Sequence, residues 1–128
     1  MNSPKSLSNV NFNDNLPFVS KVEFGINSFR AGSEEKTYIL EGDKVITEMD
    51  KDHLLNGLAK LNIGEWREEY APKSFDIAIR DTFSWYLNIY FSNGVRPVKI
   101  DGCNNAPYNF EQLLELLNID LFNMEDLR

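Results

Sequence analysis

Alternating apolar and polar positions predict a series of β-strands that begins near Phe18. Val22, Phe24 and Ile26 are separated by polar residues or glycine, which is the period-two pattern of a strand with one buried side. Shorter strands are expected at 37–40 and 45–47, and an edge strand at 77–79.

The clearest hairpin pattern lies between residues 85 and 100. The first strand carries Trp85, Leu87, Ile89 and Phe91 on one face and Tyr86, Asn88 and Tyr90 on the other. The pair Asn93-Gly94 is typical of a two-residue type I′ turn. Pro97 cannot donate a backbone hydrogen bond, so the return strand is expected at an edge or a bulge.

Two segments have the three-and-four spacing of amphipathic helices. In the first, Leu54, Leu58 and Leu61 share one face, with Asp50 as the expected N-cap and Gly64 as the expected C-terminal cap. The second places Phe110, Leu113, Leu114 and Leu117 on one stripe after Asn109, its expected N-cap. Trp66 and Tyr70 predict a further short helix over 63–70, and residues 118–128 continue amphipathically.

These elements predict an α+β fold, with an antiparallel sheet of about five strands and two main helices packed on one face. Residues 1–17 are rich in Asn and Ser and are expected to form a leader that is loose or laid over the domain surface. Residues 18–128 are expected to be a single domain, which fits a chain of 128 residues. No apolar run approaches a membrane span or a signal peptide, so a cytoplasmic protein is expected.

The charge is negative and concentrated toward the C-terminal end. Twenty acidic against 13 basic residues give a net charge of −7, and Arg128 is the one base in residues 101–128. Without a Lys or Arg cluster, we expect no direct binding to nucleic acid or to an anionic membrane. The acidic surplus can steer a basic protein partner, or it can serve solubility alone.

Residues that carry out catalysis or bind metals do not form a recognisable set. Cys103 and His53 are each the one residue of their type, and no pattern brings them together as a nucleophile and base or as a zinc site. The close carboxylate pairs are interpreted as solvated or capping groups: Glu34-Glu35, Asp50 with Asp52, and Glu68-Glu69. No phosphate loop, dinucleotide fingerprint or nucleophile elbow is present. We therefore expect no catalytic residues, no metal and no cofactor.

Two groups of residues are candidates for binding. Tyr86, Asn88 and Tyr90 present rigid, amphipathic side chains on the second face of their strand. That face could instead be covered by the leader, or both faces could be partly buried. The loop from Asp101 to Asn109 contains Asn104 and Asn105, which serve either the loop architecture or contact with a ligand.

The segment Trp85–Leu117 resembles an uncharacterised family of small bacterial proteins of Gram-positive type. The resemblance rests on the Trp-x-Leu-x-Ile strand, the Asn-Gly turn, and the loop Gly102-Cys103-Asn104-Asn105-Ala106-Pro107-Tyr108-Asn109-Phe110 before a leucine-rich helix. Arg96-Pro97 in the return strand departs from the family pattern. The resemblance covers about the C-terminal half of the chain and implies a fold without an established activity.

The sequence therefore favours a non-catalytic, soluble domain that binds another protein. One concrete form is an immunity or inhibitor protein directed at a basic toxin or nuclease. The alternative is a small-ligand-binding or enzymatic domain that uses the 101–109 loop. A monomer and a homodimer with paired edge strands both stay open.

Overall fold

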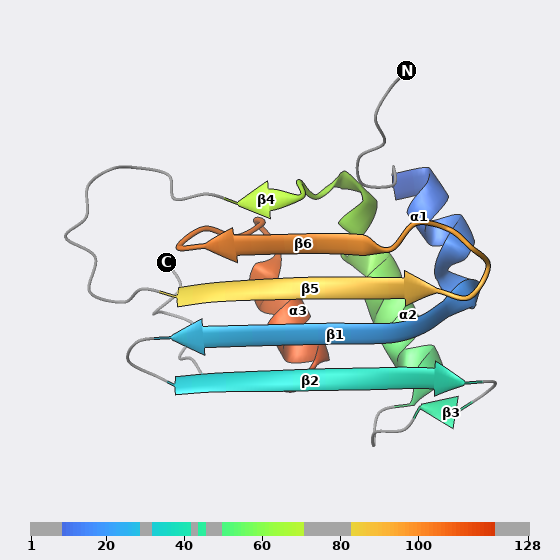
Figure 1. Ribbon diagram of the computed structural model, residues 1–128, viewed down its shortest axis with the longest axis horizontal. Coiled ribbons are helices and arrows are strands. Elements are labelled where there is room, and N and C mark those ends of the chain that lie inside the picture. Colours follow the sequence, from blue (N-terminus) through green and yellow to red (C-terminus); the bar gives the residue numbers. More distant parts are fainter. Residues whose placement is uncertain (1–8, 29–31, 42–43, 46–49, 71–82, 120–128) are drawn as a thin grey trace.

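Six strands form one sheet in the order β3-β2-β1-β5-β6-β4 (Figure 1). The computed structural model describes residues 9–28, 32–41, 44–45, 50–70 and 83–119. The strands are β1 (Val19–Ser28), β2 (Gly32–Glu41), β3 (Lys44–Val45), β4 (Glu69–Tyr70), β5 (Phe83–Phe91) and β6 (Val98–Cys103). The helices are α1 (Asn9–Asn15), α2 (Lys51–Lys60) and α3 (Phe110–Leu116), with 3₁₀ turns η1 (Leu16–Phe18) and η2 (Ile63–Glu65).

The α+β class and the mostly antiparallel sheet are confirmed. The pairs β3–β2, β2–β1, β1–β5 and β5–β6 are antiparallel. The expectation of an antiparallel sheet is wrong at one edge, because β4 pairs in parallel with β6 through Glu69 opposite Asp101 and Tyr70 opposite Gly102. The sheet is therefore mixed.

The two central strands follow the alternation predicted from sequence. Val22 and Phe24 of β1 lie opposite Ile89 and Leu87 of β5, and all four side chains are fully buried. Directly opposite residues point to the same face of a sheet, so these side chains meet in one core layer. The residues between them on β5 are half-buried on the other face.

The leucine stripe of α2 is buried as predicted. Leu54 and Leu58 are inaccessible to solvent, and Asp50 caps the helix by accepting a hydrogen bond of 3.2 Å from the backbone N–H of His53. The helix stops before Gly64, because Asn62 already has a left-handed backbone with φ of 55°. An asparagine tolerates this conformation and commonly follows the last helical turn.

Helix α3 packs its aromatic and leucine side chains into the same core. The Phe110 ring lies 4.7 Å from the Trp85 ring of β5, centroid to centroid. The Tyr38 hydroxyl of β2 donates a hydrogen bond of 3.4 Å to the carbonyl of Leu117, just beyond the helix. In Figure 1 both α2 and α3 cross behind the strands.

Asn109 occupies the N-cap position of α3 but does not cap it. Its side-chain Nδ2 instead donates a 2.7 Å hydrogen bond to the carbonyl of Leu61, at the end of α2. The expected capping role is therefore wrong: the buried amide joins the two helices.

Part of the expected leader is folded into the domain. Residues 9–18 form α1 and η1, so a segment expected to be loose or laid on the surface contributes to the core. Phe12 is fully buried, with its ring edge-on to Phe91 at 6.3 Å. The burial of this aromatic ring, together with that of Leu16, anchors the segment to the core.

The expected helix over 63–70 is wrong beyond η2. Trp66 and Tyr70 are spaced as on a helix, but Tyr70 lies on β4. Both rings pack on Trp85, at centroid distances of 6.3 and 6.0 Å, so contact with a distant strand decides the local conformation. The Tyr70 hydroxyl also accepts a hydrogen bond of 3.0 Å from the backbone N–H of Arg67.

The hairpin between β5 and β6 is confirmed, but its type I′ turn is not. The last pair in the ladder is Ile89 with Val98, so the connection is longer than two residues. Gly94 has a positive φ of 84° and Asn93 does not. The Asn93 side chain accepts a hydrogen bond of 3.3 Å from Val95 N–H, closing a local turn in place of backbone pairing. The expected strand at 77–79, the end of that at 45–47 and residues 120–128 lie outside the described residues.

Candidate functional site

The residues that alternate with the core on β1, β2, β5 and β6 share the opposite face of the sheet. We call this surface the tyrosine face. The register places one row across it, made of Glu35, Gly25, Tyr86, Asp101 and Glu69 in that order. The neighbouring rows contain Thr37, Glu23, Asn88 and Lys99, and then Ile39, Lys21 and Tyr90.

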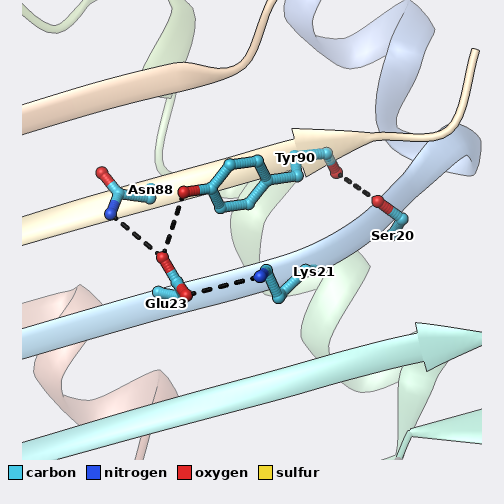
Figure 2. Close-up of polar contacts among 5 residues, drawn as sticks. All are labelled: Ser20, Lys21, Glu23, Asn88 and Tyr90. Atoms are coloured by element: carbon cyan, nitrogen blue, oxygen red, sulfur yellow. Dashed lines mark hydrogen bonds and ion pairs between the residues drawn. The ribbon is translucent and has the colours of Figure 1, made fainter. Parts of the chain in front are cut away.

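Glu23 organises the Tyr90 end of the tyrosine face (Figure 2). Its Oε1 accepts a hydrogen bond from Asn88 Nδ2 and another from the Tyr90 hydroxyl, each 3.2 Å long. Lys21 Nζ lies 3.5 Å from Glu23 Oε2. Both Lys21 and Lys99 also stand over the Tyr90 ring, 4.8 and 5.6 Å from its centroid. The polar and charged groups at this end are therefore internally paired.

The titration of this network follows from its contacts. The hydrogen bond from Asn88 is the largest cause of a lowered pKa at Glu23, and the bond from Tyr90 and the charge of Lys21 act in the same direction against partial burial. Burial, followed by the hydrogen bond to Glu23, raises the pKa of Tyr90. The pair is thus held as a carboxylate and a neutral hydroxyl donor near neutral pH.

The Tyr86 end of the face has a different character. The Tyr86 ring covers Gly25, where an added Cβ would overlap ring atom Cε2. A depression of about 720 Å³ opens beside it, whose lining includes Gly25, Glu35, Glu69, Tyr86, Asp101 and Cys103. Burial raises the pKa of the Tyr86 hydroxyl, with further contributions from the charges of Glu35 and Glu23.

Three carboxylates of this depression lack a basic partner in the described part of the chain. Glu35, Glu69 and Asp101 make no ion pair with any described lysine or arginine, whereas Glu23 and Glu34 each pair with a lysine. The carboxylates therefore give this end of the face a negative potential into which Tyr86 projects.

The two candidate asparagines of the 101–109 loop hold the loop together. Asn104 has a left-handed φ of 52°, and its Oδ1 accepts a 2.8 Å hydrogen bond from the backbone N–H of Phe83. The backbone carbonyl of Asn105 accepts a 2.9 Å hydrogen bond from Trp85 Nε1. The side-chain Oδ1 of Asn105 accepts another, also of 2.9 Å, from the backbone N–H of Ala106. Neither asparagine lines the depression. The structure thus brings Tyr86, Asn88 and Tyr90 together and sets the asparagines apart.

Cys103 and His53 do not line a common depression, and no metal-binding cluster is found within the described residues. Cys103 is exposed and lines the depression, while His53 is exposed on α2 and does not line it. Among residues 9–28, 32–41, 44–45, 50–70 and 83–119, no three His, Cys, Asp or Glu side chains are placed to hold one metal ion. The helices described are also too short or too polar for any of them to cross a membrane.

Sequence reasoning missed the residues that surround the tyrosines. The place of Glu23 and Gly25 could have been predicted, because they alternate with the apolar residues of the 22–26 segment. If β1 and β5 pair, these two residues must lie on the same face as the tyrosines. The positions of Glu35, Asp101 and Glu69 on this face depend on the register of four strand pairs, which no local pattern specifies.

Comparison of the chain with protein-family models, with curated proteins and with solved structures found no match.

Proposed function

We propose that this chain is a non-catalytic domain that binds another protein through the tyrosine face, and that the partner presents a basic surface. The observation that carries the proposal is the half-buried Tyr86 ring set among Glu35, Asp101 and Glu69, which lack basic partners among the described residues. Tyrosine offers a large contact area with little side-chain entropy to lose, and it is enriched at the energetically important positions of interfaces.

We further infer that α2 and α3 cover one face of the sheet and leave the tyrosine face for the partner. The contact of Phe110 with Trp85 and the burial of Leu54, Leu58 and Leu113 support this arrangement. Gly57 of α2 also lies against the Leu116 side chain of α3, which indicates that the two helices pack together.

The net charge of −7 supports a basic partner, because opposite charge accelerates encounter and disfavours acidic competitors. An inhibitor or immunity protein directed at a basic toxin or nuclease is one concrete form of this function. In this proposal the protein acts in the cytoplasm of a bacterium, as a monomer or a homodimer, and contacts neither nucleic acid nor a membrane directly.

A small-ligand-binding or enzymatic role of the 101–109 loop is the second candidate. The observation in its favour is that Asp101 and Cys103 line the depression. Asn104 and Asn105 already use their amide oxygens to accept backbone hydrogen bonds, so they support loop architecture better than ligand contact. Protein binding is therefore the better supported function.

The test is affinity capture from a lysate of the source organism with the wild type, Tyr86→Ala and a matched control. Tyr108→Ala is that control, because Tyr108 is 83% exposed and lies outside the tyrosine face. We expect a stoichiometric protein partner on the wild type and on Tyr108→Ala but not on Tyr86→Ala. Because Tyr86 is only partly buried, its loss should shift the Tm by no more than about 3 °C. Capture of the same partner by all three proteins, or of no stoichiometric partner, would contradict the proposal.

A further inference from the structure

We infer that the partner places an arginine side chain over the Tyr86 ring, with its guanidinium between Glu35 and Asp101. This inference rests on the proposed function and names the chemical group that the partner contributes. It makes Tyr86, Glu35 and Asp101 the residues that determine specificity on the tyrosine face.

The Tyr86 ring is half-buried and lines the depression, where a ligand can reach it. Ring atoms Cε2 and Cζ fill the space above Gly25 in which any other residue would hold a side chain, so the ring leans across β1. The glycine thus allows the aromatic ring to line the depression instead of standing away from it. A planar group that enters the depression meets the ring directly.

Two other tyrosines of the chain have cations over their rings. Lys21 and Lys99 stand over the Tyr90 ring, and Arg67 lies over the Tyr70 ring with 4.4 Å between its Cζ and the centroid. Among the described residues, no lysine or arginine occupies the same position over Tyr86. Tyr86 nevertheless lies in the row of the sheet that has Glu35 on one side and Asp101 on the other. These two carboxylates favour a cation that comes from another molecule.

The arrangement of the carboxylates favours arginine over lysine. Glu35 and Asp101 lie on β2 and β6, with β1 and β5 between them, so their backbones are about 14 Å apart. A guanidinium is planar, has five N–H donors, and can stack on the ring while it donates in the plane toward both carboxylates. An ammonium is compact and strongly hydrated, and it cannot make the stacking contact together with two lateral ones.

The charge pattern of the face also sets where the arginine can bind. At the Tyr90 end the Glu23 carboxylate is already hydrogen-bonded to Asn88 and Tyr90 and paired with Lys21. Lys21 and Lys99 repel a further cation there. The two ends of the face therefore differ in sign, and the arginine is directed to Tyr86.

The test is an NMR titration of the intact chain with three peptides that differ in one side chain. The probes are acetyl-Gly-Arg-Gly-amide, its lysine analogue and its citrulline analogue, which keeps the shape of arginine without the charge. Each is followed through the ring signals of Tyr86 and Tyr108 up to about 50 mM, a range that covers the millimolar dissociation constants expected of a single side chain. We expect the arginine peptide to shift the Tyr86 signal saturably and to leave Tyr108 unchanged.

Variants identify the groups that act. Glu35→Gln and Asp101→Asn should each weaken the arginine peptide about threefold. Glu115→Gln on the exposed side of α3 should leave its dissociation constant unchanged. Tyr86→Phe keeps the ring and should keep binding, followed through the backbone amide of Gly25, whereas Tyr86→Leu should lose it.

The inference is overturned if the arginine peptide produces no saturable shift at Tyr86, or if the lysine or citrulline peptide binds as tightly. If a partner is captured through Tyr86 but the arginine peptide does not bind, the proposed function stands and this inference fails. If the peptide binds but no partner is captured, the arginine site stands and the proposed function fails.

Discussion

The Tyr90 hydroxyl of β5 donates a hydrogen bond of 3.2 Å to Glu23 Oε1 of β1, on the face of the sheet opposite the core. The same oxygen accepts a hydrogen bond from Asn88 Nδ2, so one carboxylate of β1 is bonded to two side chains of β5. The two strands pair along nearly their whole length. Hydrogen bonds therefore connect their side chains on the tyrosine face, as packing connects their side chains in the core.

Glu23→Gln tests the contribution of this carboxylate to stability. The pKa of Glu23 is lowered in the folded protein, chiefly by the hydrogen bond from Asn88, so its ionised form stabilises the fold. A lowered pKa gives a contribution that is fully present above the unfolded value of about 4.3 and is lost as the pH falls through the folded pKa. We expect Glu23→Gln to cost about 1 kcal/mol of unfolding free energy at pH 7.

Urea unfolding of the wild type and Glu23→Gln at pH 7 and at pH 3 measures this effect. The difference between the two proteins should be present at pH 7 and shrink at pH 3, where the wild-type carboxylate takes up a proton. Glu115→Gln, on an exposed position of α3, is the matched control and should show no such difference. A Glu23→Gln effect of the same size at both pH values would show that the charge is not the source.

The faces of the central strands could be predicted because alternation is a local property of the backbone. The buried positions Val22, Phe24, Leu87 and Ile89 follow from period two alone, and Leu54 and Leu58 follow from the helical period. Neither prediction required knowledge of which elements meet.

The remaining features depend on contacts between distant residues. Trp66 and Tyr70 fit a helix by spacing, but their rings pack on Trp85, and Tyr70 joins the sheet next to β6. Phe12 and Leu16 are separated by asparagine and aspartate, and two apolar positions are too short a pattern to predict their burial. The partners of Tyr90 and Asn88 on the tyrosine face are some 65 residues away in sequence, which is why only the register identifies Glu23. The resemblance of the 85–117 segment to a bacterial family stays a prediction.

Asn104→Ala tests the architectural role of the 101–109 loop. Asn104 adopts φ of 52° and exchanges two 2.8 Å hydrogen bonds with the backbone of Phe83, one through its N–H and one through Oδ1. Alanine loses the side-chain bond and tolerates the left-handed backbone poorly, so we expect a loss of about 1 to 2 kcal/mol. Asn104→Gly removes the same bond without the backbone strain and should cost less.

Denaturant midpoints of the three proteins, together with partner capture, distinguish architecture from ligand contact at Asn104. If Asn104 is architectural, stability should fall from the wild type to the glycine variant and further to the alanine variant. Each variant that is folded should then capture the partner as the wild type does. Loss of capture by a variant of wild-type stability would instead assign Asn104 to a binding site and favour the second candidate function.

Gly25 and Gly102 provide a matched pair of substitutions on opposite faces of the sheet. A Cβ at Gly25 would overlap the Tyr86 ring, which is half-exposed and can turn away. A Cβ at Gly102 would overlap Trp85 Nε1 and come within 2.6 Å of the Asn105 carbonyl, both held in the core by their mutual hydrogen bond. The same added methyl group therefore meets a movable side chain in one case and a fixed, buried contact in the other.

We expect Gly102→Ala to destabilise the protein by about 2 to 4 kcal/mol, because the overlap forces the buried Trp85 or the backbone to shift. Gly25→Ala should cost about 1 kcal/mol or less, yet it should weaken partner capture because the displaced Tyr86 ring no longer lines the depression. Thermal unfolding and capture measured on both variants check this. Equal losses of stability, or undiminished capture by a folded Gly25→Ala variant, would show that the position of the Tyr86 ring over Gly25 does not matter for binding.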